Sequence, residues 1–177
     1  LRSSAVMPAI DRYTGVLYDA LDSATLTPAA RAFLANHVAI SSALFGLVRA
    51  GDPIPAYRLS ASSKVPNIKL KAHWSTQVSA VLAEHPGFVL DLRSESYVSL
   101  GPVPAGVASY FVRVVTESAD GTRRALNHFN KKGKGEFVRA LAEAAIDHES
   151  VNALLTWAAN NGIRLVEGAP GELDLVV

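Results

Sequence analysis

The sequence contains no cysteine among its 177 residues. Without thiols the chain can form neither a disulfide framework nor a thiolate metal site, and a reducing compartment fits this composition. No uninterrupted apolar run reaches the roughly 18 residues that a membrane-spanning helix needs, and no signal peptide is visible. The sequence therefore predicts a soluble, cytoplasmic protein with no membrane partner.

Recognisable catalytic and metal-binding motifs are absent as well. The five histidines are scattered along the chain, and none has a partner at the H-E-x-x-H spacing. There is no G-x-S-x-G elbow and no S-x-x-K motif, since Ala61 stands at the required distance before Lys64. The sequence thus predicts no metal site and no cofactor, and it assigns no catalytic residue. His128 is retained as a candidate because it ends a predicted strand beside a lysine cluster.

The residues that are present are typical of a globular domain. Hydrophobic residues make up 49% of the chain and charged residues 19%, and a chain of this length can bury a self-sufficient core. The net charge of +1 conceals an uneven distribution. Residues 123–139 hold six cations against one acid, whereas residues 140–177 hold six acids against one cation. This asymmetry predicts one basic face.

Periodicity and turn residues predict an α+β fold, arranged as a single mixed domain over residues 1–177. Thr27 and Pro28 are typical of a helix start, and a second apolar helix is expected near Ile40 to Val48. The other predicted elements are a helix over 70–84, strands over 88–92 and 109–116, a hairpin strand over 124–129, a helix over 137–146, a helix between Ser150 and Gly162, and a terminal hairpin of 163–166 with 173–177.

The segment Lys131-Lys132-Gly133-Lys134-Gly135 is the most suggestive of function. It is predicted as a turn between a strand and a helix, where backbone N–H groups and the helix dipole favour an anion. The two glycines would let the backbone approach that anion, so we expect contacts with phosphate groups. The alternative is a solvated turn whose lysines lie in water. The segment is not a P-loop, because Gly135 stands where Ser or Thr should follow the lysine.

Polar residues after the predicted strand at 88–92 form a second candidate site. The side chains that can build a pocket there are Arg93, Ser94, Glu95 and Tyr97. Alternatively, Ser94 caps a short helix and Tyr97 packs with its hydroxyl satisfied. A third candidate is Tyr57-Arg58, since arginine binds phosphate or carboxylate with a planar fork. The alternative for that arginine is a local cap or ion pair.

Several segments taken together resemble the YaaA family of bacterial peroxide-stress proteins, in its actinobacterial branch. The matching segments are Tyr13-Thr14-Gly15, His37 to Leu59, Leu92 to Tyr97 and Phe129 to Gly135. No single motif is highly specific, but their order and spacing agree over nearly the whole chain. The first strand of the family is expected ahead of Leu1, so the chain is expected to be a fragment that lacks the N-terminal portion.

The resemblance implies a mixed α/β domain with a positively charged cleft and a helix–hairpin–helix-like element, located here at residues 28–59. It also implies binding to double-stranded DNA and a role in limiting hydrogen peroxide damage by keeping free intracellular iron low. It implies no known reaction.

This chain departs from the family pattern at two places. The usual Lys-Lys-Ala-Arg-Gly is Lys-Lys-Gly-Lys-Gly at 131–135, and the usual Arg-Pro-Leu-Asp is Arg49-Ala50-Gly51-Asp52. The Gly-x-Gly turn of the common DNA-binding hairpin is absent as well. The lysines are therefore expected to carry more of the DNA binding than that element.

Hypotheses from different functional classes remain. In the first, a DNA-binding stress protein contacts phosphates through Arg49, Arg58, Lys131, Lys132 and Lys134. In the second, an enzyme acts on a phosphorylated or nucleotide-like small molecule. Its candidate pocket comprises Tyr13, Tyr57, Arg93, Ser94, Glu95, Tyr97 and His128. A third, direct iron handling, has no readable ligand cluster to support it.

Overall fold

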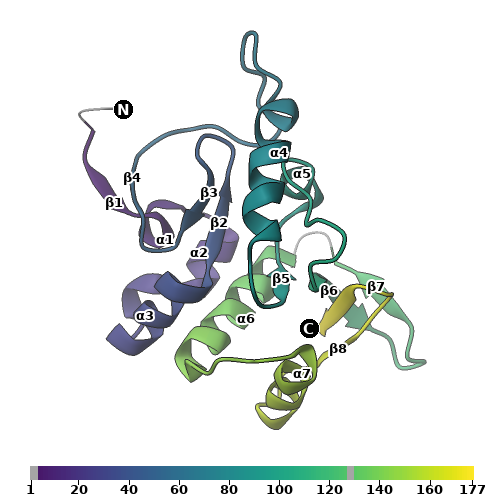
Figure 1. Ribbon diagram of the computed structural model, residues 1–177. Coiled ribbons are helices and arrows are strands. Elements are labelled where there is room, and N and C mark those ends of the chain that lie inside the picture. Colours follow the sequence, from purple (N-terminus) through teal and green to yellow (C-terminus); the bar gives the residue numbers. More distant parts are fainter. Residues whose placement is uncertain (1–3, 127–129) are drawn as a thin grey trace. The chain divides into compact units, whose positions relative to one another are not determined.

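The computed structural model describes residues 4–126 and 130–177 (Figure 1). Their contacts divide into two compact units. Unit 1 comprises residues 4–14, Ser23–His85 and Arg93–Val107, and unit 2 comprises Gly15–Asp22, Pro86–Leu92 and the described part of Ala108–Val177. The expected α+β class is confirmed, because both units combine helices with short sheets. In these two ranges no helix is both long enough and apolar enough to cross a bilayer.

Unit 2 is built on a mixed five-stranded sheet. Its central strand is β6 (Ser109–Glu117), which the sequence predicts and whose valines at 112, 114 and 115 are almost completely buried. The other strands are β5 (Val89–Asp91) and β9 (Glu172–Val176), both parallel to β6, β7 (Arg123–Ala125), antiparallel to the end of β6, and β8 (Leu165–Glu167), antiparallel to β9. The predicted terminal hairpin is thereby confirmed.

Helices α6 (Asn130–Ala144) and α7 (Val151–Asn160) supply the other half of the unit 2 core. Phe137 of α6 and Leu154 of α7 are buried against Val112 and Leu173 of the sheet. Burying each such side chain contributes about 1.5–3 kcal/mol. Helix α7 begins as predicted, since the hydroxyl of Ser150 accepts a hydrogen bond from the Ala153 N–H. A short helix, α2 (Val16–Leu21), packs along α6 (Figure 1).

The basic segment at residues 131–135 is not a turn, and this prediction is wrong. Helix α6 begins at Asn130 rather than at Phe137, so the whole segment is helical. Glycine is a poor helix former, but here it permits close packing. A Cβ on Gly135 would overlap the carbonyl oxygen of Leu17 in α2 and lie 2.8 Å from the Ala20 Cβ. Tertiary contact with α2 therefore overrides the local preference for a turn.

Unit 1 contains several short elements around two small sheets. Its helical elements are α1 (Ala9–Arg12), a 3-10 turn η1 (Ser23–Thr25), α3 (Pro28–His37), α4 (Leu70–Ala83) and α5 (Glu95–Val98), and strand β1 (Val6–Pro8) pairs antiparallel with β4 (Pro53–Pro55). The predicted start of α3 is confirmed, because the Thr27 hydroxyl accepts the Ala30 N–H at 3.2 Å. Two hydrogen bonds from the Arg31 guanidinium to the Asp11 carboxylate, at 2.6 and 3.0 Å, join α3 to α1.

The second helix expected near Ile40 to Val48 is wrong. The chain forms an antiparallel hairpin of β2 (Ala39–Ser42) and β3 (Gly46–Arg49) instead. Ile40 and Val48 are register partners and are both buried, so the apolar residues follow a period of two. Gly46 has a φ of +77°, which closes the three-residue turn. The helix–hairpin–helix-like element expected over 28–59 is thus a helix followed by a β-hairpin and a strand.

Helix α4 confirms the predicted helix over 70–84 and packs on a small apolar cluster of Ala43, Leu70 and Leu100. The indole N–H of Trp74 donates to the Ala43 carbonyl oxygen at 2.8 Å. Residues 60–69 form a loop that projects from the N-terminal end of α4 (Figure 1). This loop contains Lys64 and Lys69.

We expect Gly135→Ala to destabilise the protein by roughly 1–3 kcal/mol, because the new methyl overlaps backbone atoms of α2. The change in free energy of unfolding is measured by urea denaturation. Gly133→Ala is the matched control in the same helix. Its methyl would lie 3.2 Å from a Val114 methyl, a side-chain contact that can shift. Equal losses in the two variants would contradict the steric account.

Candidate functional site

Lys134 is the residue of the basic segment that lies inside unit 2. Its side chain is buried, with 4% of the residue exposed, and its Nζ lies 5.1 Å from the centre of the Phe111 ring. Phe111 of β6 pairs in register with Asp91, a buried residue at the end of β5. The lysine therefore belongs to a buried, partly aromatic environment at the carboxyl end of a parallel strand.

The electrostatics of Lys134 follow from this burial. Loss of hydration lowers the pKa of its ammonium group from 10.5 to about 8, and the charge of Asp91 opposes this shift. An ammonium group with such a pKa exchanges its proton near neutral pH, which an exposed lysine does not. Chemically the site can supply a neutral amine or a buried cation.

The two preceding lysines have different surroundings. Lys131 and Lys132 are exposed on α6, and the Lys132 ammonium lies 3.5 Å from the Glu136 carboxylate, one helical turn away. The Lys132–Glu136 spacing and the similar Arg139–Glu143 pair are i,i+4 signals of a helix that were present in the sequence. The three lysines thus do not form one exposed phosphate cradle.

A chain of hydroxyl groups forms a second cluster, in unit 1. The Tyr57 hydroxyl lies 2.6 Å from that of Tyr13 and 2.7 Å from that of Ser42, which is 2% exposed. The Ser42 oxygen also accepts the backbone N–H groups of Leu44 and Phe45 at 3.1 and 3.0 Å. The structure therefore brings together two residues of the predicted pocket and adds Ser42, which sequence reasoning missed.

The remaining residues of the predicted pocket have varied positions. Burial raises the pKa of Tyr97. A hydrogen bond from the Ala61 backbone opposes this rise, and nearby Tyr57 adds to it.

Three other predicted pocket residues lie at the start of α5. Arg93 donates to the Gly101 carbonyl oxygen at 2.9 Å, and Glu95, which is exposed, is the first residue of α5. Ser94 occupies the N-cap position of α5, but its hydroxyl lies 3.0 Å from that of Ser96 and makes no cap. His128 lies outside the described residues.

An uninterrupted basic segment in unit 1 was not recognised from the sequence. Residues 53–83 contain no aspartate or glutamate. They carry four exposed cations, namely Arg58, Lys64, Lys69 and Lys71. Lys69 is the N-cap residue of α4, so two of these lysines lie at the positive end of a 14-residue helix. The charge count along the sequence covered only residues 123–177. The same count over residues 1–122 would have identified this acid-free basic segment.

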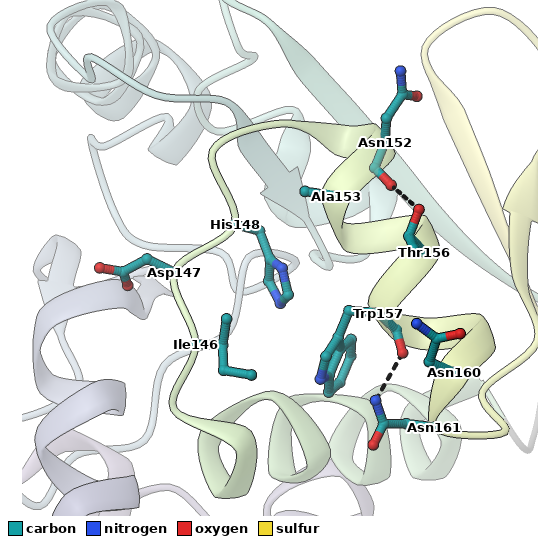
Figure 2. Close-up of a pocket in the computed structure, with 9 residues that line it drawn as sticks. All are labelled: Ile146, Asp147, His148, Asn152, Ala153, Thr156, Trp157, Asn160 and Asn161. Carbon is teal, nitrogen blue, oxygen red and sulfur yellow. Dashed lines mark hydrogen bonds between the residues drawn. The ribbon is translucent and has the colours of Figure 1, made fainter.

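An open hollow of about 540 Å³ is lined by residues 146–148 and by side chains of α7 (Figure 2). The rings of Trp157 and His148, with centres 5.2 Å apart, line it together with the asparagines at the start and end of α7. Burial lowers the pKa of His148. The hollow contains none of the residues selected from the sequence. Within the described ranges, no group of three or more histidine, aspartate or glutamate side chains is arranged to hold a metal ion.

Comparison with known proteins decides the family. A family model described as "Peroxide stress protein YaaA" matches residues 2–163. The chain belongs to the YaaA family of peroxide stress proteins. The resemblance recognised from the ordered segments is therefore confirmed, and the family supports a role in peroxide stress.

Relatives of this YaaA-family chain occur in several bacterial groups. UPF0246 protein CE1889 of Corynebacterium efficiens is 45% identical over 184 residues, covering 100% of this chain and 72% of that protein. UPF0246 protein SCO2297 of Streptomyces coelicolor is 38% identical over 97% of this chain and 67% of that protein. A UPF0246 protein of Lactobacillus delbrueckii is 31% identical over 80% of this chain. The similarity to actinobacterial proteins agrees with the branch expected from the sequence.

The buried amine of Lys134 in this YaaA-family chain should make stability depend on pH. Between the folded pKa of about 8 and 10.5, the unfolded chain binds more protons than the folded one. The free energy of unfolding should therefore rise with pH in this window, by up to about 3 kcal/mol from this group. Lys134→Met should remove that rise. Urea unfolding of both proteins across the window measures the difference. If the difference stays flat, Lys134 does not titrate as a buried amine.

Proposed function

We propose that this chain acts in the cytoplasm during peroxide stress by binding double-stranded DNA, and that it helps to limit free iron. The observation that supports DNA binding is the basic segment of unit 1, in which 31 consecutive residues, 53–83, carry four exposed cations and no acid. DNA presents a dense row of phosphates, and clustered lysines and arginines bind them by releasing counterions. The segment itself has no acidic side chain that would repel that row.

The geometry of the segment favours phosphate over a diffuse charge effect. Lys64 and Lys69 belong to the loop that projects from α4, and Lys71 lies in the first turn of that helix. The first N–H groups of a helix have no partner within the helix, and no side chain caps α4. A phosphate at this end would receive backbone donors together with ammonium groups. Ile68, 46% exposed, lies between the loop lysines and adds an apolar contact.

Of the five phosphate contacts expected from the sequence, four are kept in this proposal and one is left out. Arg58 belongs to the basic segment itself. Arg49 is exposed at the end of β3, and Lys131 and Lys132 are exposed on α6, so each is available to a phosphate. Lys134 is left out, because its buried ammonium cannot reach a phosphate at the surface. The limitation of free iron rests on the family resemblance alone, and the proposal assigns it no iron-binding residue.

The proposal predicts a salt dependence that a variant should change. Replacing Arg58, Lys64, Lys69 and Lys71 with alanine should flatten the slope of log affinity against log salt by about 0.9 for each lost phosphate contact. Binding of a labelled DNA duplex is measured by fluorescence anisotropy at several salt concentrations. An unchanged slope would rule out the basic segment as the interface.

Two comparisons sharpen this measurement. Arginine in place of Lys64, Lys69 and Lys71 keeps the charge, so the slope should stay close to that of the unmodified protein. Alanine at Lys131 and Lys132 tests the contribution of α6 and should remove at most about two units of slope. A loss with the arginine variant would show that shape rather than charge controls binding.

A second candidate function is an enzyme that acts on a phosphorylated or nucleotide-like small molecule. The observation that favours it is Lys134, since a desolvated amine beside a carboxylate at a strand end is typical of reactive sites. Screening phosphorylated metabolites by thermal shift should then reveal a stabilising compound whose effect is lost in Lys134→Met. Failure of every phosphorylated compound to stabilise the protein would count against this candidate.

A further inference from the structure

The loop that contains Lys64 and Lys69 also exposes an apolar side chain. Ile68 is 46% exposed, although it directly precedes Lys69 and the start of α4. Other apolar residues of the same stretch pack against the buried cluster of unit 1, namely Leu59, Ala61 and Val65. Ile68 is therefore an apolar group that the fold of unit 1 leaves in water, beside cations.

A tight turn holds Ile68 in place. The Ile68 N–H donates to the Val65 carbonyl oxygen at 3.2 Å, and the two residues form an isolated β-bridge. Pro66 has a fixed φ because of its ring, and Asn67 has a φ of +60°. Proline followed by a residue with positive φ is typical of a type II turn. Because Val65 packs on the buried cluster, the turn presents Ile68 from an anchored base.

The surroundings of Ile68 are basic. Lys64 lies before the turn, Lys69 follows Ile68, and Lys71 lies in the first turn of α4, and all three lysines are exposed. The sequence has no acidic residue between positions 53 and 83. Asn67 is exposed as well, and its amide can donate to the acceptor atoms in the minor groove of DNA. The turn thus combines cations for phosphates, an amide for base edges and an apolar tip.

We propose that Ile68 acts as a wedge that enters the minor groove of duplex DNA, unstacks one base step and kinks the duplex. Proteins that bind the minor groove frequently insert such an apolar side chain between base pairs and bend the DNA by roughly 20–90°. The neighbouring lysines would hold the phosphate backbones while Ile68 leaves water. The inference rests on the DNA binding proposed above and adds the groove, the contact and the deformation.

A duplex accounts for these features better than a lipid surface does. Binding to a membrane grows with the apolar area that is buried, and among the described residues of the turn Ile68 is the one large apolar side chain that is exposed. One such side chain suffices for a wedge, because it enters a single opened step. Pyrimidine–purine steps such as TA are the most easily kinked, so the wedge should favour duplexes that contain one.

The experiment uses the whole chain and a short duplex with a central TA step. Energy transfer between dyes at the two ends of the duplex reports bending, and 2-aminopurine placed at the step becomes brighter when the step unstacks. The unmodified chain should increase both signals. Ile68→Ala should leave the bound duplex straight and stacked, and should weaken binding by roughly tenfold because most of the apolar side chain is removed. The slope of log affinity against log salt should not change, since no phosphate contact is lost.

Two variants control for a general loss of apolar surface. Ile68→Leu keeps the number of carbon atoms and should kink the duplex as the unmodified chain does. Val81→Ala removes a side chain that is 57% exposed towards the other end of α4, and it should leave bending and affinity unchanged. A loss of bending in Val81→Ala equal to that in Ile68→Ala would contradict a specific role for Ile68.

The outcomes separate the wedge from DNA binding itself. A duplex that binds with the expected salt dependence but stays straight would overturn the wedge and leave the proposed function intact. Bending by Ile68→Ala as strong as that by the unmodified chain would have the same meaning. Absence of duplex binding at every salt concentration would overturn both. Binding of Ile68 to phosphatidylserine vesicles, together with a straight duplex, would overturn the wedge in favour of a lipid surface.

Discussion

Helix α6 can lie against α2 only because it carries no side chain at position 135. Gly135 lets the helix meet the backbone of α2, and Gly133 faces Val114 of the central strand. The residue between these two close contacts, Lys134, is only 4% exposed. Lys134 is therefore carried into the interior beside Asp91 and Phe111. The unusual amine of unit 2 is thus a consequence of helix packing.

In unit 1, several contacts likewise depend on one group, the hydroxyl of Ser42. The Ser42 oxygen accepts two backbone N–H groups of the hairpin turn and shares a hydrogen bond with the Tyr57 hydroxyl, so the same oxygen closes the turn and positions the tyrosine. Removal of one partner would leave buried polar groups unsatisfied, which costs about 1–3 kcal/mol for each group. The hairpin and the tyrosine pair are therefore formed together. Tyr13 and Tyr57 are 44 residues apart in the chain, so this link exists only in the folded unit.

Elements with clear end signals could be predicted from the sequence, whereas elements decided by tertiary contacts could not. Thr27 and Ser150 mark two helix starts by capping, and the apolar run of β6 identifies the central strand. The region from Ile40 to Val48 is too short for its period to distinguish helix from strand. In α6 the glycines indicated a turn because glycine has low helix propensity, while their packing role depends on α2. Burial of Lys134 could not be read locally for the same reason.

The two glycines of α6 also constrain how the sequence can change by descent. A methyl at position 133 meets movable side-chain atoms, while a methyl at position 135 meets backbone. Position 133 can therefore be exchanged in a single step. At position 135 a side chain costs stability until a change in α2 makes room for it, so a substitution in α2 is expected to precede one at position 135.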